Sequence, residues 1–170
     1  MRKPTALAVL VAIMLAAGIV LAVAPPAAAD SLSSGRAAFT RGDYNRAALL
    51  LVPLAERGNA RAQGMVGFMY ATGQGLPQNY DLAAYWYRLS AEQGDTTSQY
   101  LLGLAYDKGR GVPLDEVAAY KWLNLAAARA PMQRRESYAK LRNAVASKMS
   151  RGQLEAGQYY ALRWPADSPF

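Results

Sequence analysis

Few residues of this chain could do chemistry by themselves. None of its 170 residues is a cysteine or a histidine, which excludes disulfides, thiol chemistry, Cys/His zinc sites and serine–histidine triads. Glu92 and Asp107 are available for acid–base work, but no spacing places two carboxylates together. Asp43, Asn79 and Asp115 precede expected helices, where a side-chain oxygen caps the first turn. The sequence therefore predicts no catalytic, cofactor or metal site, and a protein that is not an enzyme.

Two glycine-rich segments, Gly73-x-Gly75 and Gly109-x-Gly111, could indicate phosphate-binding loops. A phosphate loop follows a strand and carries a Lys-Ser/Thr pair. Each of these segments follows an expected helix and lacks that pair, so we interpret them as turns.

Four conspicuous aromatic side chains could stack on a ligand. They recur in register along the chain, and an aromatic side chain buries a large area when it packs. We therefore expect them to hold helices together. They are Tyr70, Trp86, Tyr106 and Trp122.

An internal repeat supplies the elements that position these residues. Residues 67–77 align with residues 103–113, with every Gly, the Tyr and the Pro 36 positions apart. A fixed period of this length marks a solenoid of stacked helical pairs. We expect one unit at residues 60–95 and a second at residues 96–131, each with a turn in its middle.

Gly67 and Gly103 fall inside expected helices of these two units. A glycine in a helix costs up to about 1 kcal/mol relative to alanine, so its recurrence needs a compensation. Close approach of two helix backbones is the compensation we predict.

The segments on either side of the two units are also helical in pattern. Residues 30–59 form a degenerate first repeat without the long turn, and residues 132–170 form a closing pair of helices. Ser150 and Gln153 form a capping box before the last helix. The predicted fold class is all-α, a right-handed α-solenoid of roughly eight helices.

Residues 1–29 have the pattern of an export signal. Arg2 and Lys3 precede an apolar run at residues 6–24, and an A-x-A ending predicts cleavage after Ala29. The run is also near the length that spans a bilayer, so an uncleaved anchor stays open. Either way we expect the rest of the chain outside the cytoplasm: periplasmic, secreted, or anchored to the inner membrane facing the periplasm.

The repeat motif resembles the Sel-one-like repeat (SLR), a relative of the tetratricopeptide repeat. The matching residues of the first full unit are Gly67, Tyr70, Gly73, Gly75, Ala83, Trp86, Tyr87, Ala91 and Gly94. Those of the second are Leu102, Gly103, Tyr106, Gly109, Gly111, Val112, Asp115, Ala119, Trp122, Ala126 and Ala127. The resemblance implies an exported bacterial adaptor that binds a protein or peptide on its concave surface. Some secreted relatives are discussed as β-lactam-binding or hydrolysing proteins, but those carry a cysteine pair in each repeat, which this chain lacks.

The first helix of each unit lines the inner curve of such arrays. The residues on the outward face of these helices are therefore the predicted partner-binding surface, with apolar side chains as anchors. They are Arg61, Phe68, Thr72, Thr97, Tyr100, Leu104 and Lys108. Asp107 falls on the same predicted face.

Residues 132–148 are strongly basic, with only Glu136 opposing the cations. The segment is either a solvated helix face or a docking surface for anionic headgroups or an acidic partner. The basic residues are Arg134, Arg135, Lys140, Arg142 and Lys148.

The net charge is +7, and without Arg2 and Lys3 of the expected signal it is about +5, which favours weak attraction to anionic polymers or surfaces. Export argues against nucleic acid as the partner. Our main hypothesis is a monomeric, non-catalytic interaction scaffold with a protein or peptide partner. Two alternatives stay open: a cell-wall enzyme or its regulator acting on peptidoglycan or a β-lactam, and a binder of anionic surfaces with possible membrane proximity.

Overall fold

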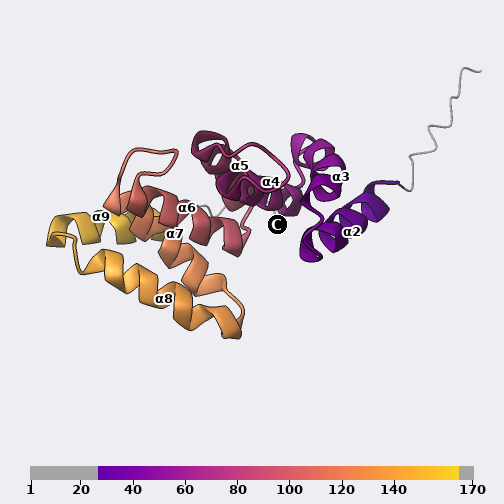
Figure 1. The fold of residues 1–170 in the computed structure, drawn as a ribbon. Coiled ribbons are helices and arrows are strands. Elements are labelled where there is room, and N and C mark those ends of the chain that lie inside the picture. Colours follow the sequence, from indigo (N-terminus) through magenta and orange to yellow (C-terminus); the bar gives the residue numbers. More distant parts are fainter. Residues whose placement is uncertain (1–26, 165–170) are drawn as a thin grey trace, which may run out of the picture.

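The structure, a computed structural model, describes residues 27–164, and within them the chain forms eight α-helices and no strands. Helices α2 and α3, α4 and α5, and α6 and α7 pair into hairpins that follow one another in a row (Figure 1). The predicted all-α solenoid is confirmed. The helices are α2 (Ala27–Thr40), α3 (Tyr44–Glu56), α4 (Ala60–Thr72), α5 (Tyr80–Glu92), α6 (Thr96–Lys108), α7 (Glu116–Arg129), α8 (Met132–Ala146) and α9 (Arg151–Leu162).

Each helix from α3 to α7 begins after an Asp or Asn that satisfies free amide groups of its first turn. The side-chain oxygen accepts a hydrogen bond from the backbone N–H three residues along. The capping residues are Asp43, Asn59, Asn79, Asp95 and Asp115. The caps predicted at Asp43, Asn79 and Asp115 are confirmed, and those at Asn59 and Asp95 are additional.

Gly67 and Gly103 bring the two helices of each full hairpin into backbone contact. A Cβ atom at Gly67 would lie 2.7 Å from Cδ1 of Tyr87 and 3.2 Å from the carbonyl oxygen of Ala83. At Gly103 it would lie 2.7 Å from a leucine side chain and 3.2 Å from the carbonyl oxygen of Ala119. The close approach predicted for both glycines is confirmed.

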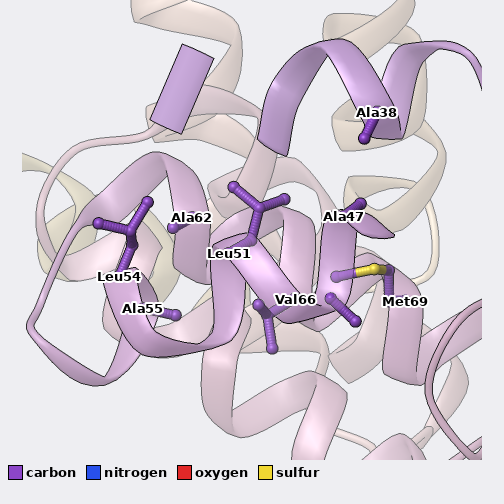
Figure 2. Packing of buried hydrophobic residues seen from close by; sticks show 9 residues of the cluster. Ala38, Ala47, Leu51, Leu54, Ala55, Ala62, Val66 and Met69 are labelled. Carbon is purple, nitrogen blue, oxygen red and sulfur yellow. The ribbon is translucent and has the colours of Figure 1, made fainter. Parts of the chain in front are cut away.

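The core runs through the row as a series of clusters. The first joins α2, α3 and α4, and its small side chains let three helices pack closely (Figure 2). Its buried residues are Ala38, Ala47, Ala48, Leu51, Leu54, Ala55, Ala62, Val66 and Met69. The repeated aromatic residues belong to this core system: Trp122 is buried, and Tyr70, Trp86 and Tyr106 pack half-buried against the clusters.

Each full hairpin has one buried glutamine that connects it to the hairpin before it. Gln63 donates from Nε2 to the carbonyl oxygen of Ala55 at 3.1 Å, and its Oε1 accepts from Gln93 at 2.7 Å. Gln99 lies 36 positions later and donates in the same way to Ala91 at 3.2 Å. No residue of the described range bonds to Oε1 of Gln99. The hydrogen bond from the glutamine Nε2 to the preceding hairpin is therefore present in both units, whereas the hydrogen bond to the glutamine Oε1 is present only in the first of the two.

The last two helices both pack on α7 and end the row (Figure 1). In α9, a Cβ atom at Gly157 would lie 2.8 Å from Cδ1 of Tyr120, so the two helices are close. Trp164 meets Trp122 edge to face, with ring centroids 5.6 Å apart. The predicted capping box begins α9 at Ser150. The pair covers the last repeat, as a terminal unit of a solenoid must.

Asp107 is buried, contrary to the prediction that it lies on the outward face. Its side chain is 2% exposed, with Oδ1 2.8 Å from Nζ of Lys148 and Oδ2 2.8 Å from Nζ of Lys108. Burial alone would raise the pKa of Asp107, but hydrogen bonds and positive charge from both lysines outweigh it, so the pKa lies below the ordinary value. This contact ties the end of α6 to the loop between α8 and α9.

Most of the predicted export signal lies outside the described residues. Helix α2 begins at Ala27, so the predicted cleavage point after Ala29 falls in its first turn. In residues 27–164 we find no helix that combines the length and apolar character needed to cross a membrane.

We predict that Gln63→Met destabilises the fold more than Gln99→Met. The substitution at Gln63 removes two side-chain hydrogen bonds. The substitution at Gln99 removes one hydrogen bond, and it also removes a buried oxygen without a partner, which offsets part of the loss. We expect Gln63→Met to lower the free energy of unfolding by about 1–2 kcal/mol, and Gln99→Met by about 1 kcal/mol less. Urea unfolding followed by circular dichroism measures both. Equal losses, or a larger loss at Gln99, would contradict this account of the link.

We predict that Asp107→Asn destabilises the protein at neutral pH by about 1–2 kcal/mol, because it removes two charge-assisted contacts from half-exposed lysines. Since the pKa of Asp107 is lowered by folding, its contribution is present above the pKa of an unfolded aspartate, about 4, and is lost as the pH falls through the lower folded value. The stability gap between variant and parent should shrink in that acidic window.

Urea titrations at neutral and acidic pH measure this gap. Asp115→Asn is the matched control, because asparagine caps the equivalent helix at position 79. A gap that stays constant with pH would show that the ion pair does not stabilise the fold.

Candidate functional site

A groove runs along the first helices of successive units, and we call it the inner groove. It is lined by α2, α4 and α6 and by the first turn of α8, and encloses about 500 Å³. Apolar side chains and arginines share its lining. The lining residues are Arg36, Phe39, Arg61, Gly64, Met65, Phe68, Asp95, Thr97, Ser98, Leu101 and Arg134.

A smaller hollow of about 200 Å³ adjoins the inner groove between α4 and α6, and we call it the apolar well. The two share Phe68 and Leu101 as a common wall. The remaining lining residues are Ala71, Thr72, Tyr80, Ala83, Ala84, Tyr87, Leu104, Ala105 and Arg110. Burial raises the pKa of Tyr87 well above its usual range.

Five of the seven predicted partner-binding residues line these two hollows. Arg61 and Thr97 line the inner groove, Thr72 and Leu104 line the apolar well, and Phe68 lines both. The structure therefore brings the larger part of the predicted surface together in one continuous depression.

Tyr100 and Lys108 line neither hollow. The ring of Tyr100 stacks on Tyr138 of α8, with centroids 4.3 Å apart and an angle of 15° between the planes. Lys108 pairs with Asp107 at 2.8 Å. Both side chains thus contact other residues of this chain, and a prediction from the face of a single helix does not take such contacts into account.

The repeat register explains the floor of the depression. Arg61 and Thr97 are 36 positions apart, as are Phe68 and Leu104, and a third pair with this spacing, Met65 and Leu101, completes the floor. That third pair was not among the predicted residues, although the period could have found it. Arg36, Phe39, Tyr80 and Arg110 were also not predicted, because they lie in the degenerate repeat, at the start of α5 and in a turn, outside the first helices of the two full units.

Positive charge dominates the inner groove. The guanidinium groups of Arg36, Arg61 and Arg134 come from three different helices, and none of them forms an ion pair with the described side chains of residues 31–164. Arg134 donates to Oγ1 of Thr97 at 3.0 Å, which orients it at the groove. The one carboxylate of the lining, Asp95, accepts from the backbone N–H of Ser98 at 2.7 Å as the cap of α6.

The five predicted anionic-surface residues contact different partners. Arg134 lines the inner groove. Arg135 donates to the carbonyl oxygen of Ala130, Lys140 pairs with Glu136, Arg142 donates to Asn124 and Asn143, and Lys148 pairs with Asp107. The sequence showed Glu136 as the only opposing acid, and the fold adds Asp107 from 41 positions away.

The glycine-rich turns pack against neighbouring units. A Cβ atom at Gly75 would overlap the carbonyl group of Tyr44, and one at Gly111 would overlap that of Tyr80. Both glycines have positive φ angles, +74° and +71°. Each turn therefore touches the start of the second helix of the preceding unit, which agrees with their interpretation as turns. In the described part of the chain, no three His, Cys, Asp or Glu side chains group as metal ligands would.

Comparisons with known proteins agree with this geometry. The family model of the Sel1 repeat matches residues 60–95 and 96–130. A protective antigen of uropathogenic Escherichia coli displaying an SLR fold is similar with a TM-score of 0.73 and 26% identity, over 81% of this chain and 29% of that one. This chain thus spans less than a third of the length of that antigen.

A Sel1 repeat protein from Oxalobacter formigenes is similar with a TM-score of 0.57 and 32% identity, over 66% of this chain and 88% of that one. A sequence comparison with curated proteins gave no significant match. Two consecutive matches to the repeat and this relative show that the chain belongs to the Sel1 repeat family.

Proposed function

We propose that this protein is a scaffold that holds a segment of another protein in its inner groove, with one apolar side chain of that segment in the apolar well. The observation that carries the proposal is the continuity of the two hollows across Phe68 and Leu101. Sel1 repeat proteins generally mediate protein–protein interactions, and their fold is typically a non-catalytic scaffold.

The lining of the apolar well suits an anchor side chain. Phe68, Leu101 and Leu104 are half-buried, so each still presents apolar surface that a partner would cover. Covering such surface contributes about 25 cal/mol per Å², and a few anchors in well-packed pockets dominate the energy of most interfaces. An edge-to-face contact with Phe39, at 5.4 Å between centroids, fixes the ring of Phe68. The anchor site is therefore largely preformed.

We also propose that the protein acts outside the cytoplasm, as a periplasmic or secreted protein or one anchored to the inner membrane. The basic start, the apolar run and the A-x-A ending of residues 1–29 support this. Cell fractionation of the tagged full chain tests it, and recovery of the protein in the cytoplasm alone would contradict it.

We predict that filling or polarising the apolar well weakens binding without unfolding the protein. A library of short random peptides displayed on phage supplies ligands, and calorimetry measures their affinity for the full chain. Ala71→Phe occupies the well and Leu104→Asn places an amide in it. Each should weaken peptides that compete for the groove by at least about tenfold, the loss expected for a central anchor.

Leu162→Ser is the control, because Leu162 is 85% exposed on α9 and lines neither hollow. Circular dichroism and urea unfolding establish that each variant is folded. Peptides that bind the well variants as tightly as the parent would refute the proposed site.

A further inference from the structure

We propose that the segment held in the inner groove is acidic, with carboxylates on both sides of the apolar side chain that enters the well. This rests on the proposed function and adds the chemistry of the partner. It follows from charges that the three-helix lining brings together.

The arginines of the inner groove are available to a ligand. Arg36, Arg61 and Arg134 belong to α2, α4 and α8, and among residues 31–164, whose side chains the structure describes, no carboxylate lies within ion-pair distance of them. Arg134 donates to the neutral hydroxyl of Thr97, which leaves its positive charge uncompensated. The neighbouring Arg135 and Arg142 line neither hollow and donate to Ala130 and Asn124. A planar guanidinium group with five donors fits a carboxylate better than any other side chain does.

The negative charge already in the groove does not neutralise these arginines. Asp95 is the only acid in the lining, and its Oδ1 caps the first turn of α6 through the N–H of Ser98. Three cations thus face one carboxylate that already has a structural partner. An occupant with its own carboxylates would complement this excess, whereas a basic segment would be repelled.

A fourth arginine lies at the other side of the apolar well. Arg110 lines the well together with Tyr80, with the guanidinium carbon 5.7 Å from the centroid of the tyrosine ring. The well is thus flanked by Arg110 on one side and, beyond Phe68 and Leu101, by the arginines of the groove on the other. A bound segment with an apolar residue in the well, and acidic residues before and after it in sequence, would place carboxylates near the arginines on both sides.

The well also distinguishes a protein segment from an anionic lipid surface. Its lining is apolar and recessed between two helices, with Tyr87, Ala83 and Ala84 buried at its base. A bilayer presents headgroup charge over a plane and attracts any exposed basic face. The joint requirement for a side-chain anchor and carboxylates favours an acidic peptide.

Three synthetic peptides with one central Trp test the proposal: the flanking residues are Glu in the first, Gln in the second and Lys in the third. Calorimetry on the full chain should give an affinity for the Glu peptide at least about tenfold above that for the Gln peptide, with the Lys peptide weaker still. The preference should decline as salt rises, because the arginines are exposed.

The charge-neutral triple variant Arg36→Gln, Arg61→Gln, Arg134→Gln should lose the preference for Glu over Gln. The matched control is Arg41→Gln, Arg46→Gln, Arg57→Gln, three exposed arginines that line neither hollow, and it should retain the preference. Equal affinity for the Glu and Gln peptides, or equal loss in both triple variants, would overturn the inference. So would vesicles of phosphatidylglycerol that displace the Glu peptide and bind Leu104→Asn as tightly as the parent.

The random library separates this inference from the function on which it rests. Enrichment of acidic peptides whose binding needs Leu104 supports both. Enrichment of neutral or basic peptides whose binding needs Leu104 keeps the scaffold function and refutes the acidic partner. Binders that all ignore the well refute the scaffold site itself.

Discussion

At Gly67 and Gly103 the backbones of two paired helices touch, and this contact sets the direction in which each first helix presents its other side chains. With Tyr87 or Leu123 packed where a Cβ atom would otherwise lie, the first helix cannot rotate about its axis without a clash. The side of the helix that carries Met65 and Phe68 in one unit, and Leu101 and Leu104 in the next, is thereby fixed toward the inner groove and the apolar well. The binding surface thus depends on a contact made on a different side of the same helix.

The repeat is the reason that so much of this architecture could be predicted. Caps at Asn79 and Asp115, turns at the paired glycines and packing of the tryptophans are either local in sequence or present twice, so each copy supports the interpretation of the other. Phe68 and Leu104 were predicted from helix-face geometry, which placed them on the side of each first helix away from its packed face. Met65 and Leu101 lie outside the arc that this geometry selects, and their 36-residue spacing was not used to find them.

The parts that could not be predicted involve the ends of the row, where no period applies. Helical periodicity indicates which face of α8 is apolar but not which helix α8 packs against, so the stacking of Tyr100 on Tyr138 could not be predicted. The burial of Asp107 by Lys148 spans 41 residues and has no equivalent in the other unit. The arginines of the groove come from α2 and α8 as well as α4, and only the folded chain brings those three helices to one place.

The glutamine link, the glycine contact and the cap all lie within a single 36-residue period. A unit of this kind carries what it needs to attach to a copy of itself, whereas α8 and α9 both pack on α7. Duplication between the two existing units would therefore lengthen the floor by one more pair of apolar positions and leave the charged ends as they are. The number of repeats would set the length of partner segment that the floor can contact, while the charged residues at the two ends of the row would stay the same.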